Sequence, residues 1–351
     1  MAINVTLYDT DSLLGLYREV PAASAYFRDL AFNQVITFEE EYIDFQKIKE
    51  GRKLAPLVVP TVQGRAVYSE ASSVTRLKPA YVKPKDAVNP ARVIRRRPSE
   101  SLFSPNSLSP QARYNAIIGD ILRVHRETID RREEWMAARA LIDGKLTLSG
   151  VDYPTRVVDF GRAANHTVVL GVGARWGDAG VKPMVDIQTW IDRVRRADFG
   201  GPVNRLTVGS SVLPILLADA DVQKQLDTQL RGSSADLNTG LRSGEYVEYI
   251  GKLGPNLELW VNSDFYEDPD TGTATPYLDP KSILLTGPNV MGVRCFGAIL
   301  DEKAGFNAMA VFPKMWPQQD PSATYVMTQS APLTVPVNPN NTLSAKVLNA
   351  A

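Results

Sequence analysis

Residues 109–144 predict a single helix whose length limits how the rest of the chain can fold. The stretch opens with Ser109, a good N-cap, and Pro110, which suits the first helical position. Gly144 stands just past the expected end. Such a helix has about 34 residues and is roughly 50 Å long at 1.5 Å per residue. This exceeds the usual helix in a globular protein, so the helix should span much of the molecule.

The side chains of this helix predict how it packs. Apolar and small residues recur at three- and four-residue steps, at Tyr114, Ile117, Ile118, Ile121, Val124, Thr128, Ile129, Trp135 and Met136. Glu127 and Arg131 are spaced to pair on the exposed side. Because the heptad pattern is not sustained, we expect a helix that packs across a sheet rather than a coiled coil.

Residues 78–98, KPAYVKPKDAVNPARVIRRRP, combine basic side chains with four prolines. Each proline fixes its own φ and pushes the preceding residue toward extended conformations, so we expect an extended segment without a helix. Tyr81, Val88 and Val93 are among the apolar side chains that interrupt the charge. A purely solvated tail would not need them, and we expect another surface to cover them.

The remainder of the chain predicts a compact α+β unit. Strand patterns at residues 145–148 and 155–160 indicate a hairpin, and helix patterns lie at residues 186–197 and 211–226. Further strands are expected at residues 203–209, 245–250, 257–262, 282–286, 307–312 and 324–330. The Gly/Ser-rich residues 231–244 indicate a mobile surface loop, and the chain is expected to end in a Pro/Asn-rich tail.

Composition excludes several classes of protein. The 351 residues are 44% hydrophobic and 22% charged, which is typical of about two folded domains. Basic and acidic residues both number 39, so no net charge draws the chain to DNA or to an anionic membrane. Cys295 is the only cysteine, which excludes an internal disulfide and leaves too few thiols for a structural zinc site. No signal peptide and no run of ~20 apolar residues is visible, so we expect a soluble intracellular protein.

Three short motifs point toward chemistry, and each is incomplete. VVLGVGARWG (residues 168–177) has Trp176 where a dinucleotide fingerprint needs its third glycine. GSSVLP (residues 209–214) lacks G-x-S-x-G, and Ser210 or Ser211 fits better as the N-cap of the next helix. DPDTG (residues 268–272) resembles the start of a calcium loop, but Asp279 replaces the bidentate glutamate, so a hairpin tip is favoured. His125 and His166, the only histidines, lack a metal-ligand partner at i+4. We therefore expect no enzyme, no cofactor and no metal.

Four blocks, in the same order, resemble the major capsid proteins of phage lambda and its relatives. They are YVKPKDAVNP (residues 81–90) with the arginines at 95–97, GKLTLSGVDYPTRVVDFGR (144–162), VQKQLDTQLRGSSADL (222–237) and PKMWPQQDPSATYVMTQSAPL (313–333). The resemblance covers nearly the whole chain. It implies the α+β Hong Kong 97-type capsid fold, with an N-terminal arm (1–48), an E-loop (49–98), a P-domain with a spine helix (99–185), an A-domain (186–288) and a return to the P-domain with a C-terminal tail (289–351).

The same resemblance implies a structural head protein that self-assembles into the icosahedral shell around the double-stranded DNA of a tailed phage. The implied partners are other copies in pentamers and hexamers, a trimeric decoration protein, scaffold and portal during assembly, and packaged DNA, with no membrane. The implied location is the virion, after assembly in the cytoplasm of the bacterial host. A lysine–asparagine cross-link is not carried over, because Lys53 and Lys78 lack the matching context.

Two sets of residues are expected at contacts. Between subunits we expect Glu39, Glu40, Glu41, Tyr81, Lys83, Lys85, Arg95, Arg96 and Arg97. Against a decoration protein we expect Gln63, Gly64, Arg65, Ala66, Val67 and Tyr68. Two alternatives stay open: a nucleic-acid-binding protein that uses residues 78–98, with steeply salt-dependent affinity for DNA, and a small-molecule enzyme on the α+β unit.

Overall fold

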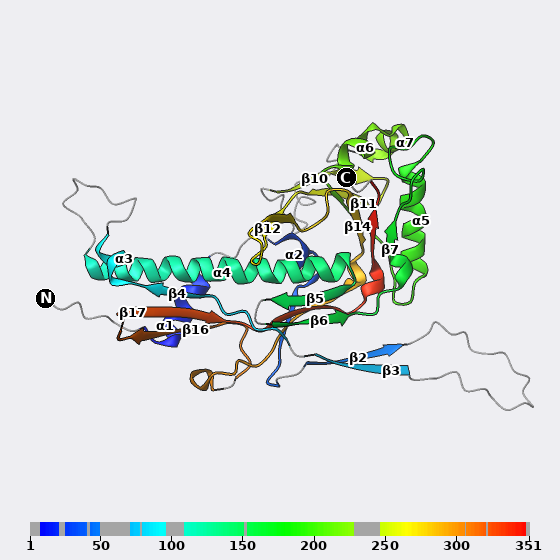
Figure 1. The fold of residues 1–351 in the computed structure, drawn as a ribbon. Coiled ribbons are helices and arrows are strands. Elements are labelled where there is room, and N and C mark those ends of the chain that lie inside the picture. Colours follow the sequence, from blue (N-terminus) through cyan, green and yellow to red (C-terminus); the bar gives the residue numbers. More distant parts are fainter. Residues whose placement is uncertain are drawn as a thin grey trace, which may run out of the picture.

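A computed structural model describes residues 8–20, 25–40, 43–49, 71–77, 79–95, 109–150, 153–227, 246–305, 307–320 and 322–348. A long helix, α4 (Pro110–Ile142), runs along the molecule, with strands below it and a sheet domain above one end (Figure 1). Among the described helices, none is long and apolar enough to cross a membrane.

Helix α4 confirms the sequence prediction at both ends. The Ser109 side chain accepts a hydrogen bond from the Ala112 N–H, and Pro110 occupies the first turn. The chain leaves the helix at Gly144 with φ +67°, a conformation that favours glycine. The Glu127–Arg131 pair is also confirmed, at 3.8 Å. Val124, expected on the apolar stripe, is 45% exposed instead, because the neighbouring His125 turns into the core.

The sheet domain is built on seven strands. Their order across the sheet is β7 (Thr167–Val169), β19 (Thr342–Lys346), β14 (Ser282–Thr286), β8 (Arg205–Gly209), β11 (Leu257–Asn262), β10 (Val247–Leu253) and β9 (Leu226–Asp227). Strands β7, β19, β8 and β11 point the same way, and β14 and β10 run against them. The expected strands at residues 257–262 and 282–286 are therefore confirmed.

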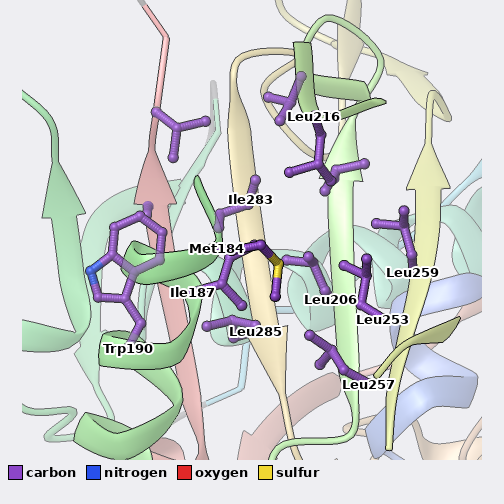
Figure 2. Close-up of a cluster of buried hydrophobic side chains, with 14 of the residues drawn as sticks. Met184, Ile187, Trp190, Leu206, Leu216, Leu253, Leu257, Leu259, Ile283 and Leu285 are labelled. Carbon is purple, nitrogen blue, oxygen red and sulfur yellow. The ribbon is translucent and has the colours of Figure 1, made fainter. Parts of the chain in front are cut away.

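The core of this domain lies between the sheet and three helices, α5 (Pro183–Arg196), α6 (Val212–Ala218) and α7 (Ala220–Gln225). Figure 2 shows Met184 and Ile187 of α5 pointing at Leu206 and Leu285 of the sheet. The opposite face packs on the end of α4 and on α2 (Tyr26–Ala31). The sheet is thus covered on both faces, which explains why β8 and β14 are buried throughout.

Two predictions for this domain were wrong. Residues 211–226 form two helices rather than one, since the Asp219 carboxylate accepts hydrogen bonds from two backbone N–H groups and starts a new helix. Ser211 stands at the N-cap position of α6, but its side chain makes no capping hydrogen bond. The expected tail contains β19, the second strand of the sheet. Pro339, Asn340 and Asn341 lie directly before this strand and form the short helix η4 (Pro339–Asn341).

Smaller sheets lie along α4. One contains β1 (Gln34–Thr37), β15 (Gly292–Phe296) and β18 (Pro332–Pro336), and another contains β16 (Phe312–Gln318), β17 (Ala323–Gln329) and β4 (Lys85–Val88). The predicted hairpin after α4 is confirmed as β5 (Lys145–Gly150) and β6 (Tyr153–Asp159), and a shorter one joins β12 (Phe265–Glu267) to β13 (Ala274–Pro276). Helix α1 (Thr10–Glu19) contacts β16 and α4. The remaining short helices are η1 (Ala164–His166), η2 (Pro288–Val290) and η3 (Glu302–Ala304).

The segment expected to be extended, residues 78–98, contains a short helix, α3 (Pro90–Ile94). The prediction failed because Pro90 occupies the first turn, where its missing N–H is no loss and its fixed φ suits a helix. Val88 and Val93 pack against α4 of the same chain, so it is this chain that covers those side chains.

A two-stranded hairpin, β2 (Ile43–Lys49) and β3 (Ala71–Leu77), extends away from the rest of the molecule (Figure 1). Its strands pair over their whole length, with Ile43 opposite Leu77. The hairpin therefore starts before the expected E-loop boundary at residue 49, while residues 79–95 belong to the body through β4 and α3. The strand predicted at residues 307–312 begins only at Phe312, the first residue of β16. The loop predicted at residues 231–244 lies outside the described residues.

Candidate functional site

Charged residues at four-residue spacing on α4 hold the N-terminal segment. Arg126, Asp130 and Glu134 lie along one face of the helix, and we call them the arm clamp. The Arg126 guanidinium donates to the backbone carbonyl of Tyr17 at 2.6 Å, and also to that of Val20. These carbonyls end α1 and have no partner within their own helix, so a cation is favoured there.

Glu134 caps the start of α2, where it accepts hydrogen bonds from backbone N–H groups. Its two carboxylate oxygens accept the backbone N–H groups of Phe27 and Arg28 at 2.7 and 2.8 Å. Its burial raises the pKa of this carboxyl group to about 7. Between the two caps, the Arg28 side chain donates to Asp130 at 3.1 Å. One helix thus supplies a positive charge to the end of α1 and an acceptor to the start of α2.

The adjacent residue, Glu133, connects α4 to a different element. It is 4% exposed and pairs with Arg294 of β15 at 3.2 Å. Desolvation raises the pKa of Glu133 despite the nearby arginines. Consecutive glutamates on α4 therefore fix the N-terminal segment and the β1–β15–β18 sheet to the same turn of helix.

Arg162 joins the carboxyl end of α4 to the seven-stranded sheet. Its guanidinium donates to the carbonyl oxygens of Leu141 and Ile142 at 2.7 Å each, and to Thr167 Oγ1 of β7 at 2.6 Å. Burial lowers the pKa of Arg162 to about 10. A Cβ atom on Gly144 would lie 2.6 Å from the Arg162 side chain, so the glycine leaves room for this contact. We call this junction the elbow.

His125 connects α4 to the β16–β17–β4 sheet. Its ring nitrogens lie 3.0 Å from Asp86 Oδ2 of β4 and 2.9 Å from Thr328 Oγ1 of β17. Its burial lowers the pKa of the imidazole. Both ring nitrogens of His125 therefore have a hydrogen-bond partner, and the side chain serves to join the helix to the sheet. His166 is also buried, with Nδ1 2.9 Å from the Thr342 carbonyl oxygen.

The other face of this sheet carries an aromatic and basic surface. Lys85 lies on the opposite face of β4 from Asp86, since successive side chains alternate between the two faces of a strand. Its ammonium group lies 4.0 Å from the ring centre of Tyr325 and 5.3 Å from that of Trp316. The two rings stack at 5.7 Å. This half-buried surface is the best-formed feature that includes a residue expected at a subunit contact.

The structure separates the expected contact residues instead of bringing them together. Glu39 and Glu40 are exposed just after β1, while Lys83 lies over the Tyr81 ring at 4.9 Å. The Tyr81 hydroxyl donates to the Ala298 carbonyl. Arg95 is exposed at the end of α3. The remaining expected residues, namely Glu41, Arg96, Arg97 and all six of Gln63, Gly64, Arg65, Ala66, Val67 and Tyr68, lie outside the described residues.

The incomplete motifs have structural roles. Asp268 and Gly272 close the tip of the β12–β13 hairpin, where the Gly272 N–H donates to the Asp268 carbonyl at 2.7 Å. Trp176 is buried against Trp190 of α5 at 5.9 Å. Within the described residues, no group of histidine, cysteine or acidic side chains is arranged to hold a metal ion.

Sequence reasoning missed the arm clamp and the elbow. The i, i+4, i+8 spacing of Arg126, Asp130 and Glu134 was a usable signal, because like spacing on a helix places side chains on one face. Nothing in the sequence identified which segments they bind, since Phe27 is more than 100 positions away. Arg162 gave no local signal of its own.

The long helix, the sheet domain above its end and the projecting hairpin define a subunit of the Hong Kong 97-type capsid fold. A solved structure of the putative capsid protein of a prophage of Escherichia coli CFT073 matches with a TM-score of 0.76 and 26% identity, over 98% of this chain and 100% of that one. The mature capsid of bacteriophage PhiM1 shares the fold, with a TM-score of 0.51 at 12% identity, 100% of this chain and 93% of that one being covered.

The sequence comparisons give the family. The model of phage major capsid protein E matches residues 9–347. The major capsid protein of Enterobacteria phage P21 is 31% identical over 97% of this chain and 99% of the relative. That of Escherichia phage lambda is 28% identical over 98% and 100%. The chain therefore belongs to the phage major capsid protein E family, and its function is that of a structural capsid protein.

Proposed function

We propose that this chain assembles with further copies, in pentamers and hexamers, into the icosahedral shell that encloses the double-stranded DNA of a tailed phage. The observation that carries the proposal is the β2–β3 hairpin, with which no third described strand pairs. A two-stranded hairpin is marginally stable in water and needs a further surface to pack on. In a shell, that surface belongs to a neighbouring copy.

Removing the hairpin tests this proposal. Deletion of residues 64–80 takes out β3 and leaves the seven-stranded sheet and α4 untouched. We expect soluble protein that unfolds cooperatively but forms no closed shells by negative-stain electron microscopy, whereas the full chain forms them. Normal shells from the deleted chain would contradict the proposal.

The expected contact residues become more specific proposals. The surface formed by Lys85, Trp316 and Tyr325 presents two stacked aromatic rings, a residue type enriched at protein interfaces, beside one ammonium group. Glu39 and Glu40 are exposed between β1 and the hairpin. We expect them to face a neighbouring copy in the shell. We include Tyr81 and Lys83, which precede β4 and contact each other. Arg95, Arg96, Arg97 and Glu41 are included on the sequence alone. Replacing Lys85 by Gln should lower shell yield without changing the unfolding temperature of the free subunit.

Further partners are proposed from family membership. A trimeric decoration protein would contact Gln63, Gly64, Arg65, Ala66, Val67 and Tyr68, and scaffold and portal proteins would act during assembly in the host cytoplasm before the virion is complete. Co-sedimentation of assembled particles with a purified decoration protein, using Tyr68→Ala as the variant, tests the first of these. Unchanged binding to the variant would remove Tyr68 from the contact.

The same proposal assigns no catalytic role. Nucleic-acid binding through residues 78–98 gains no support from the geometry, since Lys83 and Lys85 lie over aromatic rings of this chain and Arg95 stands beyond α3. A filter-binding titration against DNA tests this directly: we expect weak affinity, and tight, steeply salt-dependent binding would favour the alternative.

A further inference from the structure

The joint between α4 and the seven-stranded sheet combines a smooth apolar contact with a few directed polar ones. Of the five buried α4 residues in the apolar cluster at this joint, three are alanines, namely Ala137, Ala138 and Ala140. The same cluster contains Trp260 of β11 and Leu284 of β14. Alanine side chains project little from a helix, so they form shallow ridges that interlock weakly with the surface they pack on. The apolar contact therefore holds the helix to the sheet more strongly than it fixes the angle between them.

Arg162 supplies the directed contacts of the elbow. Besides the carbonyl oxygens of α4 and the hydroxyl of Thr167, its guanidinium lies 3.3 Å from Thr342 Oγ1 and 3.4 Å from Ser344 Oγ, both on β19. One planar group thus contacts the last turn of α4 and two adjacent strands of the sheet, β7 and β19. Because the guanidinium is rigid, its donors reach all of these acceptors together only over a narrow range of angles between helix and strands.

Arg139 adds a second polar attachment through a different segment of the sheet domain. Its guanidinium donates to the carbonyl oxygen of Tyr277, in the segment between β13 and β14, and pairs with Asp143 at the end of α4 at 3.4 Å. The chain connection is also tied, since the Phe160 N–H donates to the Gly144 carbonyl at 3.2 Å. Figure 1 shows the sheet domain standing above this end of α4, so these contacts lie where the two parts of the subunit meet.

We propose that the elbow determines the size of the assembled particle, with Arg162 holding the angle between α4 and the sheet domain at which copies close into a shell of one diameter. The inference rests on the proposed shell assembly and adds a residue that determines its outcome. Identical copies form a closed particle only when the rotation from each copy to the next allows closure. An angle set inside the subunit is repeated in every copy, so a small change in it alters the curvature of the whole shell.

Arg162 acts here as a positioning residue, because its hydrogen bonds stay within its own chain. Lysine at this position keeps the charge but carries three donors on one rotatable ammonium group. Arg162 has five acceptors, on Leu141, Ile142, Thr167, Thr342 and Ser344. An ammonium group cannot serve all five, so it would hold either the helix or the strands firmly, and the angle between them would be less well defined.

Arg162→Lys tests the inference through the diameter of the particles, measured by electron cryo-microscopy. We expect shells whose distribution of diameters is about twofold wider than that of the unmodified chain, or whose mean diameter is shifted. Arg193→Lys is the matched control. Arg193 of α5 also donates to a backbone carbonyl, that of Asn165, at 2.8 Å, and neither residue belongs to α4. The control should give the unmodified distribution.

Thr167→Val provides a second variant that should fold. Thr167 is exposed on β7, valine suits a strand, and the substitution removes the acceptor at 2.6 Å that Arg162 has on the sheet. We expect the distribution of diameters to change in the same direction as in Arg162→Lys, by a smaller amount. If Arg162→Lys gives no particles, this variant decides the question. Loss of particles from Thr167→Val as well would contradict the inference, because the elbow would then be needed for assembly itself and not for the diameter.

Diameter separates this role from a purely stabilising one. A residue that only stabilises the subunit would, when replaced, lower the unfolding temperature and the yield of shells but leave their diameter unchanged. The unmodified distribution of diameters from both variants would therefore overturn the inference, at any yield, and would leave the proposed function intact. Absence of shells from the unmodified chain, under conditions where the subunit is folded, would overturn the proposed function as well.

Discussion

Glu134 is the residue on which the arm clamp depends most. It is 2% exposed, and its two oxygens hold two separate backbone N–H groups of α2. Two N–H groups at a helix start have no partner within the helix, and leaving one buried and unsatisfied costs about 1–3 kcal/mol. The N-terminal segment is therefore ordered against α4 by an acceptor that no neighbouring residue replaces in the described structure.

We expect Glu134→Gln to destabilise the free subunit by about 1–3 kcal/mol, because the amide keeps one acceptor oxygen and turns an N–H group toward a backbone donor. Urea unfolding followed by fluorescence measures the change. Glu127→Gln is the matched control: Glu127 lies on the same helix but forms exposed pairs with Arg123 and Arg131, so its loss should cost less than about 1 kcal/mol. Equal effects of the two substitutions would contradict the role given to Glu134.

The raised pKa of Glu134 predicts a pH dependence with a definite sign. Between its ordinary value of 4.5 and about 7, this carboxyl group holds a proton in the folded chain and not in the unfolded one. Folding then takes up a proton, so the contribution of Glu134 to stability falls as pH rises through that window and is constant above it. The full effect is about 3 kcal/mol.

This contribution is measured as the stability of the unmodified chain minus that of Glu134→Gln, followed from pH 4.5 to pH 7. Taking the difference cancels other groups, including His125, whose lowered pKa gives the opposite trend below pH 6.5. A difference that grows with rising pH would mean that Glu134 is charged in the folded chain throughout.

At the scale of the elements, α4 organises the molecule through its two ends and its charged face. Its amino end is set by Ser109, and its carboxyl end by Gly144 and Arg162. Arg162 comes back to this end because the β5–β6 hairpin returns the chain to the place where it left the helix. Helix, hairpin and β19 thus meet at the elbow, which relates the direction of α4 to that of the sheet.

Gly144, which follows α4, and Gly119, which lies inside it, give opposite predictions. Gly144→Ala should destabilise by at least about 1–2 kcal/mol, because φ +67° is costly for alanine and its Cβ would meet Arg162. Gly119→Ala, inside α4, meets nothing within 4 Å and should stabilise by about 0.5–1 kcal/mol through helix propensity. Thermal unfolding of both variants checks this, and a stabilising Gly144→Ala would refute the geometry of the elbow.

Elements with strong local signals were predictable from the sequence, and long-range pairings were not. Ser109, Pro110 and Gly144 fixed α4 because capping acts within a few residues. The same local rules failed at Pro90, which starts a helix, and at Asp219, which interrupts one. The placement of β19 depends on pairing with β14 and β7, information that no window around residues 342–346 contains.

The candidate site was less predictable than the fold for the same reason. The expected contact residues came from charge runs and from the family resemblance, and those that the structure describes lie after β1, before and within β4, and after α3. The arm clamp and the elbow consist of charged side chains that bind backbone groups of distant segments. The family resemblance predicted the class of protein, whereas the contacts of the arm clamp and the elbow became visible only in the three-dimensional structure.

At the scale of the whole molecule, the chain combines a seven-stranded sheet that is packed on both faces with a two-stranded hairpin, β2–β3, that pairs with no other described strand. Strands β8 and β14 are central in a sheet packed on both faces, so their amides should open only on global unfolding. Strands β2 and β3 form a sheet of two, whose free energy of opening should be near zero in a free subunit.

Hydrogen exchange should therefore distinguish the hairpin from the sheet as the shell forms. In free subunits or capsomers, the amides of residues 43–49 and 71–77 should exchange rapidly, while those of β8 and β14 are protected. In finished particles the proposed contact with a neighbouring copy should protect the hairpin, and each 1.4 kcal/mol that this contact contributes should slow exchange about tenfold. The central strands serve as the internal control, because their protection should be similar in both forms. Equal exchange of the hairpin in capsomers and in shells would mean that assembly adds no cover to the hairpin, and the stabilising contacts of the shell would then have to lie on other surfaces of the subunit.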